Sequence, residues 1–312
     1  MIVRLGIERL AAFRSLDIAL SPGLNVVTGM NATGKTHLLR ILHAGCLDPE
    51  GKGFGRTLVH LFGWEGRRFD RLLFRSTGER ESAVEYNFLG GALSIRFKKT
   101  AHSSDSAHVS VTGRPVAAGG SLLFPGSLPE EPVSGRMSER TDPSLGPAFA
   151  RLEKALPGRV VRRNGRYRIR NTKGELEIPL ASSGIRQLAI LSLMIRLGTL
   201  IPGTVFLWDA PEADIGPAFM GEAVGVLLEL AKAGVQIVVA TRDYVFLKEC
   251  DLRRKDGVSL MYHSLFRDDR EDRIRVSSSE ELSFLSPNPA SEAFRSLFDR
   301  DVDRALKRTG SP

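Results

Sequence analysis

The run Gly29–Thr36 constrains the fold of this chain more than any other feature of the sequence. It reads Gly-Met-Asn-Ala-Thr-Gly-Lys-Thr and fits the pattern G-x-x-x-x-G-K-T. The short apolar run Leu24–Thr28 before it predicts a buried strand, and leucines at helical spacing after it predict a helix. A strand, a glycine-rich loop and a helix in this order predict a phosphate-binding unit within an α/β fold.

This loop has the chemistry that a phosphate chain requires. A glycine-rich turn lets backbone N–H groups point inward, and the following helix adds the positive end of its dipole. Lys35 is predicted to reach the β- and γ-phosphates, and the Thr36 hydroxyl to bind Mg²⁺. The alternative is a turn that only closes a βα unit. The residues predicted to hold the nucleotide here are Gly29, Asn31, Ala32, Thr33, Gly34, Lys35 and Thr36.

A second apolar run ends in a carboxylate. Thr204–Asp209 reads Thr-Val-Phe-Leu-Trp-Asp, which predicts a buried strand with Asp209 at its tip. Beside the phosphate loop, that carboxylate would bind Mg²⁺ through water. Any buried strand can end in Asp, so the prediction depends on the loop. Thr36 and Asp209 are therefore the predicted metal ligands.

Ser182, Ser183 and Gly184 begin a predicted helix about 25 residues before Asp209. Small residues at a helix N-terminus form an anion site. Because the chain already has a phosphate loop, this second site is expected to serve a different nucleotide. The alternative is an ordinary helix cap made by Ser182 or Ser183.

Six runs together carry a family resemblance: Phe13–Leu16, Leu24–Gly29, Gly34–Thr36, Ala181–Gln187, Trp208–Ala213 and Ala240–Asp243. They resemble the ABC-type ATPase head of the RecF, SMC and OLD-like branch. More narrowly, they resemble small prokaryotic AAA-family ATP-binding proteins whose strand reads W-D-E-P-E-A-N. The resemblance covers about residues 1–45 and 178–250. It implies an α/β P-loop NTPase fold, with a mixed sheet, an antiparallel lobe and a helical signature lobe.

The resemblance also implies cofactors and a partner. In that family two heads pair head to tail, and each ATP lies between one phosphate loop and the other subunit's serine-glycine signature. The expected cofactors are therefore ATP and Mg²⁺, the expected assembly is a homodimer, and Ser182, Ser183 and Gly184 would contact the partner's ATP. Arg14 and Ser15 would touch the base or phosphate as in relatives, unless they belong to a simple strand connection.

The sequence departs from the family at two chemical positions. Where relatives have the Glu that polarises the attacking water, this chain has Ala210, and where they have a γ-phosphate-sensing His it has Arg242. Losing a general base costs about 10² to 10⁴ in rate. Three explanations stay open: natural loss of hydrolysis, an engineered ATP trap, or substitution by Glu212 or Asp214. The predicted catalytic positions are Asp209, Ala210, Glu212 and Arg242.

The domain interpretation follows from the same pattern. Residues 1–250 are predicted to form the head, with an insertion at about 100–178, and residues 251–312 a tail of strands, loops and a terminal helix. Residues 100–147, rich in Ser, Gly and Pro, predict a loop or mobile insertion, and Arg159–Leu180 predicts a hairpin. Further strands are predicted over 2–8, 16–20, 71–75, 84–88, 93–97 and 235–241, and helices over 182–200, 217–233, 244–249 and 290–308.

Two segments nearer the carboxyl end carry separate expectations. Residues 251–286 are expected to form irregular strands and loops. The apolar face of the helix 290–308 is expected to pack on its own domain. No sustained heptads occur, which argues against a long coiled-coil arm.

Charge and cysteine content bear on partners and compartment. Lys and Arg number 44 against 36 Asp and Glu, a net charge of +8 that favours acidic partners such as nucleic acid. An Arg-rich genome gives the same bias, so nucleic acid stays an open partner class. The arginines between Arg159 and Arg170 would either meet phosphates or form a solvated strand face. Cys46 and Cys250 form no CxxC pair, and no apolar run has the roughly 18 residues of a membrane span, which predicts a cytoplasmic protein.

The function expected from these features is an ATP-gated dimeric head with weak or absent hydrolysis that switches or scaffolds a partner protein. By family analogy, that partner is a nuclease or toxin encoded nearby, in prokaryotic anti-phage defence. Two alternatives stay open: a competent ATPase motor acting directly on DNA, and a DNA-binding regulator in which ATP is structural.

Overall fold

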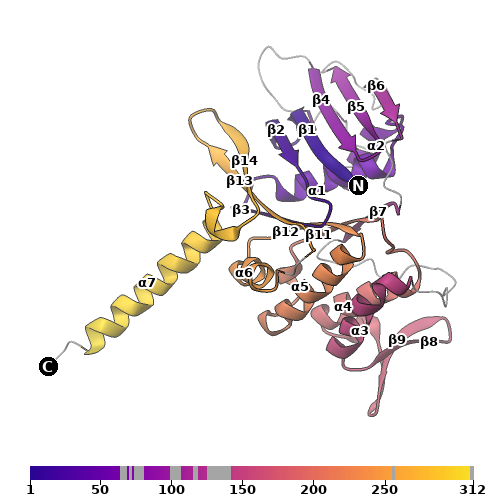
Figure 1. Ribbon diagram of the computed structural model, residues 1–312, viewed down its shortest axis with the longest axis vertical. Coiled ribbons are helices and arrows are strands. Elements are labelled where there is room, and N and C mark those ends of the chain that lie inside the picture. Colours follow the sequence, from indigo (N-terminus) through magenta and orange to yellow (C-terminus); the bar gives the residue numbers. More distant parts are fainter. Residues whose placement is uncertain are drawn as a thin grey trace.

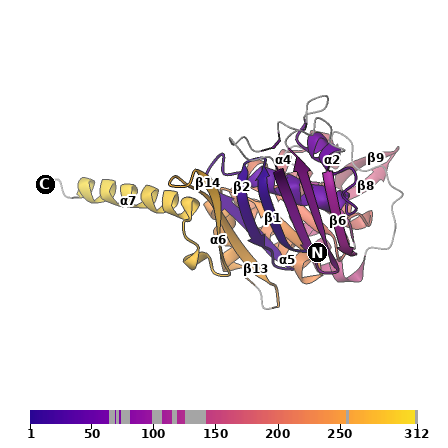
Figure 2. The same cartoon turned by 90° about the horizontal axis from the view of Figure 1, so that it is seen from above.

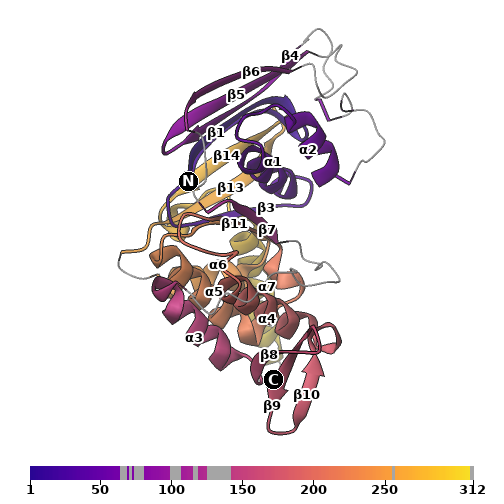
Figure 3. The same ribbon diagram turned by 90° about the vertical axis from the view of Figure 1, so that its right-hand side faces the viewer.

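The molecule is built in layers, which Figure 3 shows from the side. An antiparallel sheet lies at one end, followed by helix α1 (Lys35–Leu47), a central sheet, and a layer of helices with a small third sheet beyond it. The computed structural model describes residues 1–63, 69, 72–73, 81–98, 107–114, 119–124, 142–254 and 257–309.

The central sheet positions the phosphate loop. Its strand order is β14 (Arg273–Ser279), β13 (Leu260–Asp268), β3 (Leu24–Gly29), β12 (Gln236–Ala240), β11 (Val205–Asp209) and β7 (Ser121–Phe124). All neighbouring pairs are parallel except β13 with β14. The carboxyl ends of β3, β11 and β12 therefore meet at one edge, which is where ligands bind in open α/β sheets. The buried strands predicted at Leu24–Thr28 and Thr204–Asp209 are confirmed.

The N-terminal sheet covers α1 on the side away from the central sheet. It is antiparallel and contains β2 (Phe13–Ala19), β1 (Ile2–Leu10), β4 (Glu81–Phe88), β5 (Gly91–Lys98) and β6 (Ala107–Gly113), with α2 (Phe54–Leu61) beside α1. One hydrophobic core joins α1 to both sheets. Gly45 lets α1 approach this sheet closely, because a Cβ there would lie 2.4 Å from the Tyr86 ring. The Tyr86 hydroxyl donates to the Ile41 carbonyl at 2.6 Å, which fixes the contact.

Four helices cover the other face of the central sheet: α3 (Gly146–Ala155), α4 (Ser183–Arg196), α5 (Pro217–Lys232) and α6 (Tyr244–Leu252). The predicted helices over 182–200, 217–233 and 244–249 are thus confirmed. Beyond α4 lies a three-stranded antiparallel sheet of β8 (Arg159–Arg163), β9 (Arg166–Asn171) and β10 (Gly174–Glu177). The hairpin predicted over Arg159–Leu180 therefore contains a third strand, because the chain also turns at Asn164 and Gly165, both at positive φ.

Two segments that were expected to lack regular strands contain them where the structure describes the chain. Residues 100–147 were expected to be a loop, yet they contribute β6 and β7. Residues 251–286 were expected to be irregular, yet β13 and β14 form a regular hairpin, and β13 pairs with β3 in the central sheet. Both misreadings arise because pairing with neighbouring strands overrides weak periodicity. The strand expected at residues 71–75 lies mostly outside the described residues; within it, Leu73 bridges to Leu10.

Helix α7 (Pro289–Thr309) projects away from the body of the molecule (Figures 1 and 2). Its first turns contact α6, where the Phe294 ring stacks on Tyr244 with centroids 4.1 Å apart. Further along, Leu297, Phe298 and Leu306 are 55%, 60% and 64% exposed. The expectation that this apolar face packs on its own domain is therefore wrong. In the part of the chain that the structure describes, no helix combines the length and apolarity that crossing a membrane requires.

Candidate nucleotide-binding site

A cavity of about 470 Å³ opens at the edge where β3, β11 and β12 end. It brings together the loop, the end of β11 and the residues that follow β12, which are far apart in sequence. Its lining residues are Ala12, Asn31, Ala32, Thr33, Gly34, Lys35, Thr36, His37, Asp209, Ala210, Glu212, Ala240, Thr241 and Arg242. Most of the residues predicted for nucleotide, metal and catalysis thus share one site.

The phosphate loop requires glycine at both ends of its pattern. Gly29 has φ +148°, and a Cβ there would lie 2.3 Å from the carbonyl oxygen of Leu265. Gly34 has φ +85°, and a Cβ there would lie 2.8 Å from the Phe13 ring. Ala32 also has positive φ, at 63°. Such a loop turns its backbone N–H groups toward one concave surface, which suits an anion.

The start of α1 faces the same cavity. Its N-cap is Gly34, and no side chain there caps the first turn, so the first N–H groups of this helix of 13 residues are available to a phosphate. This cradle fits the phosphates of a nucleotide. Thr36, in that first turn, and Asp209, at the tip of β11, both line the cavity. Such a pair would hold Mg²⁺, which takes its remaining ligands from phosphates and water.

Lys35 lies inside this cavity. Its Nζ donates to the carbonyl oxygens of Gly29 at 2.6 Å and Met30 at 2.8 Å. Burial, and then the nearby Arg242, lower the pKa of Lys35, while Asp209 and Glu212 oppose that shift. A bound phosphate chain would supply the negative charge that favours the ammonium form.

Ala210 follows Asp209 in a strained backbone conformation. Its φ and ψ are 49° and 59°, in the left-handed region that an alanine rarely adopts. A hydrogen bond of 2.8 Å from its N–H to the Ala240 carbonyl ties it to the end of β12. Ala210 lines the cavity, so a longer side chain at this position would extend from a fixed backbone beside the phosphate loop.

The two carboxylates that could replace the missing glutamate lie in different places. Glu212 lines the cavity and accepts hydrogen bonds from the Thr241 hydroxyl at 2.9 Å and the Arg242 N–H at 3.0 Å. Asp214 is not among the cavity's lining residues; it accepts a hydrogen bond from the side-chain amide of Gln187 on α4. Of these two carboxylates, only Glu212 lies in the cavity, so only Glu212 is placed to act as an alternative general base.

Arg242 lines the cavity and contacts the phosphate loop. Its guanidinium donates to Asn31 Oδ1 at 2.9 Å, which links the segment after β12 to the phosphate loop. The sequence identified Arg242 by its place after β12 but contained no sign of this contact with Asn31. The contact puts an additional cation at the site.

The serine-glycine signature is not part of this cavity. Ser182 is an exposed N-cap residue whose side chain makes no capping hydrogen bond. The Ser183 hydroxyl donates to the Asp214 carbonyl at 3.2 Å, and a Cβ on Gly184 would lie 3.0 Å from that oxygen. The start of α4 therefore packs on the loop after Asp209.

Arg14 and Ser15 line a different cavity of about 560 Å³, together with residues of the turn between β13 and β14. They do not line the cavity of the phosphate loop, so the geometry gives their predicted contact with the nucleotide no support.

Four residues of the main site were not predicted as site residues, and two of them, Ala240 and Thr241, lie within a recognised run. Ala12 and His37 flank motifs that were recognised, so adjacency was the only signal. The His37 ring lies 5.0 Å from that of Phe62. Burial, and then Arg40, lower the pKa of His37.

Comparison with known proteins shows partial similarity in sequence and wide similarity in fold. No family model matches the chain. Part of it is 32% identical over 123 residues to the DNA replication and repair protein RecF of Xanthomonas axonopodis pv. citri (strain 306), and 30% identical to that of Xanthomonas oryzae pv. oryzae (strain MAFF 311018). The match covers 39% of this chain, and only 30% of the length of those relatives.

Solved structures are similar over most of the chain. An SMC head bound to the C-terminal winged-helix domain of ScpA superimposes with a TM-score of 0.65 at 14% identity, covering 89% of this chain and 97% of that one. The SMC head of Thermotoga maritima gives 0.55 at 13% identity, with 89% and 98% covered. An SMC head from Pyrococcus furiosus, bound to the C-terminal domain of ScpA, gives 0.60 at 13% identity, with 95% and 99% covered.

The fold is that of an ABC-type ATPase head, with its mixed central sheet, antiparallel lobe and helical lobe. The predicted fold class is therefore confirmed. The chain is thus similar to RecF proteins over part of its sequence and to SMC heads in its fold, which agrees with the resemblance that the sequence motifs carry.

Proposed function

We propose that this protein is an ATP-binding head that forms a head-to-tail dimer around ATP and Mg²⁺ and hydrolyses ATP slowly or not at all. The observation that carries the proposal is a cavity with Lys35, Thr36 and Asp209 in place and with Ala210 where relatives have the glutamate. The parts for binding are present, whereas the usual general base is missing.

Support for a dimer comes from the serine-glycine signature, which is missing from the cavity of its own chain. The signature residues Ser182–Gly184 do not line it, although the exposed Ser182 begins a helix of 14 residues whose N-terminus suits an anion. Because α4 packs on the loop after Asp209, it is not free to swing into its own cavity. A second copy, turned head to tail, would present this N-terminus to the γ-phosphate and complete the site.

ATP would hold such a dimer together only until the ATP is hydrolysed. A slow hydrolytic step would lengthen the dimer's lifetime, which suits a protein that switches or scaffolds a partner rather than one that cycles rapidly. Two of the similar structures are SMC heads bound to domains of ScpA, which supports a protein partner for this head as well. A nuclease partner and a role in anti-phage defence rest on family analogy alone.

The test is the mass of the protein by light scattering with and without Mg-ATP. We expect a monomer without nucleotide and a dimer with it. Ser182→Arg would place a long side chain at the signature without removing an internal hydrogen bond, and is expected to abolish the ATP-dependent dimer while leaving ATP binding intact. Ser110→Arg, on the exposed side of β6, is the matched control. An unchanged mass with ATP, or a dimer that survives Ser182→Arg, would refute head-to-tail pairing.

Gly184→Arg would also disrupt the pairing, but its Cβ would press on the Asp214 carbonyl within the same chain. Ser182→Arg is therefore the cleaner variant.

A competent ATPase is the second candidate function. The observation that favours it is Glu212, a carboxylate in the cavity beside Asp209. In that case Glu212 would act as the base, and phosphate release would be fast without any change at Ala210.

A further inference from the structure

The small sheet beyond α4 carries an unusual concentration of arginine on its outer face. Alternate residues of a strand point to the same side. Tyr167 and Ile169 of β9 are buried in the core, so the residues between them face outward. The outward residues are Arg159, Val161 and Arg163 on β8, Arg166, Arg168 and Arg170 on β9, and Glu175 and Glu177 on β10.

Arginines lie directly opposite each other on this face. Arg159 is the cross-strand partner of Arg170, and Arg163 is the partner of Arg166. Like charges in directly opposite positions destabilise a sheet. These two opposed arginine pairs therefore do not by themselves stabilise the sheet, and a bound polyanion would relieve the repulsion between them.

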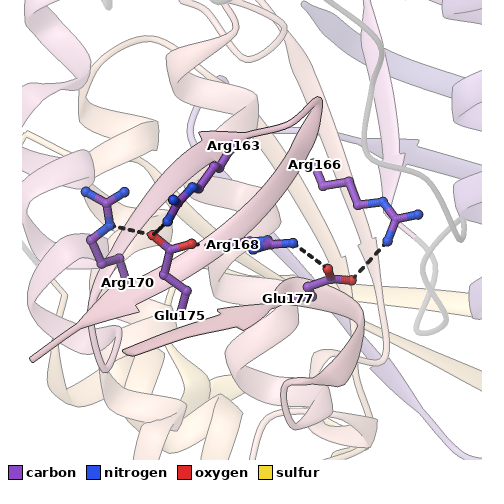
Figure 4. Close-up of polar contacts among 6 residues, drawn as sticks. All are labelled: Arg163, Arg166, Arg168, Arg170, Glu175 and Glu177. Carbon is purple, nitrogen blue, oxygen red and sulfur yellow. Dashed lines mark hydrogen bonds and ion pairs between the residues drawn. The ribbon is translucent and has the colours of Figure 1, made fainter. Parts of the chain in front are cut away.

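Two glutamates hold the arginines in place, as Figure 4 shows. Glu175 accepts from Arg170 at 2.8 Å and also lies within 3.5 Å of Arg163 and Arg168. Glu177 accepts from Arg168 at 2.8 Å and lies 3.5 Å from Arg166. The Arg170 hydrogen bond is the main cause that lowers the pKa of Glu175, so this carboxylate stays ionised.

Three of the arginines face solvent more than the carboxylates do, whereas Arg168 is only 26% exposed. The side chains of Arg163, Arg166 and Arg170 are 61%, 74% and 54% exposed, against 15% for Glu175 and 31% for Glu177. Each guanidinium has five N–H donors, and a carboxylate at its inner edge uses at most two. Outer donors of these three arginines therefore remain available, and five arginines against two glutamates leave the face positively charged.

The sheet is rigid enough to present these groups as an array. The Arg196 guanidinium at the end of α4 donates to the Val160 carbonyl at 2.6 Å, and Tyr167 and Ile169 are in the core. Arginines two residues apart on a strand are about 6.6 Å apart, and adjacent strands are about 4.8 Å apart. Arginine forms paired hydrogen bonds with phosphate oxygens.

We propose that this arginine face binds the phosphate backbone of duplex nucleic acid. A duplex fits better than a single strand because the outward residues of β8, β9 and β10, all within the described chain, include no aromatic ring on which an unpaired base could stack. Contacts with phosphates alone carry no sequence information, so binding is independent of sequence. This surface is separate from the nucleotide cavity and does not depend on the proposed ATP-gated dimer.

The test measures the affinity of the full chain for a fluorescent DNA duplex of mixed sequence over a range of salt concentrations. The double variant Arg163→Gln and Arg166→Gln removes one opposed pair at the tip of the β8–β9 hairpin. We expect the affinity to fall by at least about tenfold, and the slope of log K against log salt to become shallower by about 2. The control, Arg295→Gln with Arg304→Gln on exposed α7, removes the same net charge and is expected to bind as the wild type does.

Thermal melting checks that the first variant is folded, and Lys35→Ala, which tests ATP binding, is expected to leave duplex binding unchanged. A duplex of RNA that binds with similar affinity would support contact with the backbone alone. The proposal is overturned if the arginine-face variant binds as the wild type does, if the α7 control loses as much affinity, or if a single strand or polyglutamate binds more tightly than the duplex.

Discussion

Replacing Ala210 by glutamate tests why ATP turnover is expected to be slow. Ala210 lines the cavity with Lys35, Thr36 and Asp209, and its N–H is held by the Ala240 carbonyl at 2.8 Å. The direction of the Cα–Cβ bond is therefore fixed. A glutamate at this position would reach from the cavity wall toward the water that attacks the γ-phosphate, and could accept its proton.

The expected size of the effect follows from the chemistry of a general base. A positioned base contributes about 10² to 10⁴ in rate, which corresponds to about 3 to 5 kcal/mol of barrier. The cost to folding is small, because φ of 49° is already unfavourable for alanine and a glutamate bears a similar penalty. Ala210→Glu should thus change turnover far more than stability.

The assay is single-turnover release of phosphate from the preformed Mg-ATP complex. Ala210→Gln is the matched control, because it has nearly the same size but no base. A second arm, Ala210→Glu with Arg242→His, restores both residues of the family pattern and removes a cation that would pair with the new carboxylate. If neither variant with the glutamate hydrolyses ATP faster than Ala210→Gln does, the missing base is not what limits the reaction. If the wild type already turns over at about 1 s⁻¹ or more and Glu212→Gln stops it, then Glu212 is the base.

Three further outcomes are expected. Lys35→Ala removes a cation from the cavity and should raise the Kd for ATP, measured by calorimetry, by at least about tenfold, or about 1.4 kcal/mol; an unchanged Kd would exclude the loop as the binding site. Arg242→Ala removes a charged hydrogen-bond donor worth about 1.5 to 3 kcal/mol. It should therefore speed ATP dissociation, measured by stopped flow, by about 10- to 100-fold. An unchanged rate would mean that Arg242 contacts only Asn31 and not the nucleotide. Burial lowers the pKa of His43 and of His263 to about 4, below the unfolded value near 6.5. Well above pH 6.5 both histidines are neutral in the folded and unfolded chain, so they do not change the free energy of unfolding. As the pH falls from there toward 4, protonation of the unfolded chain lowers that free energy. Urea unfolding should therefore show a loss of about 2 kcal/mol per histidine between pH 7 and pH 5, and His43→Gln should make that loss smaller.

The sequence predicted the parts of the site that lie next to buried strands. Gly29 and Asp209 each end an apolar run, and such runs fix both the strand and its carboxyl edge; Lys35 belongs to the motif that begins at Gly29. The contacts of Arg242 with Asn31 and of Glu212 with Thr241 join segments far apart in the chain, so no local pattern indicates them.

Strands with weak patterns were missed for a related reason. Residues of β7 and β13 form strands because the central sheet offers them a partner, and that stabilisation does not depend on their own periodicity. The prediction for α7 was wrong for a different reason. Its apolar spacing predicted a buried face, but the direction in which the helix leaves α6 keeps most of that face exposed.

The two departures from the family pattern act in the same direction. Without a carboxylate at position 210, the attacking water would have no base in its usual place, so we expect bound ATP to persist. With Arg242 at the loop, a charged donor adds to Lys35 on the same anion, so both ATP and its hydrolysis product would leave more slowly. A motor needs rapid chemistry and rapid release, and each change opposes one of them. The pair is therefore consistent with a nucleotide that is held rather than consumed, and Ala210→Glu alone should restore the chemistry while Arg242 still delays release.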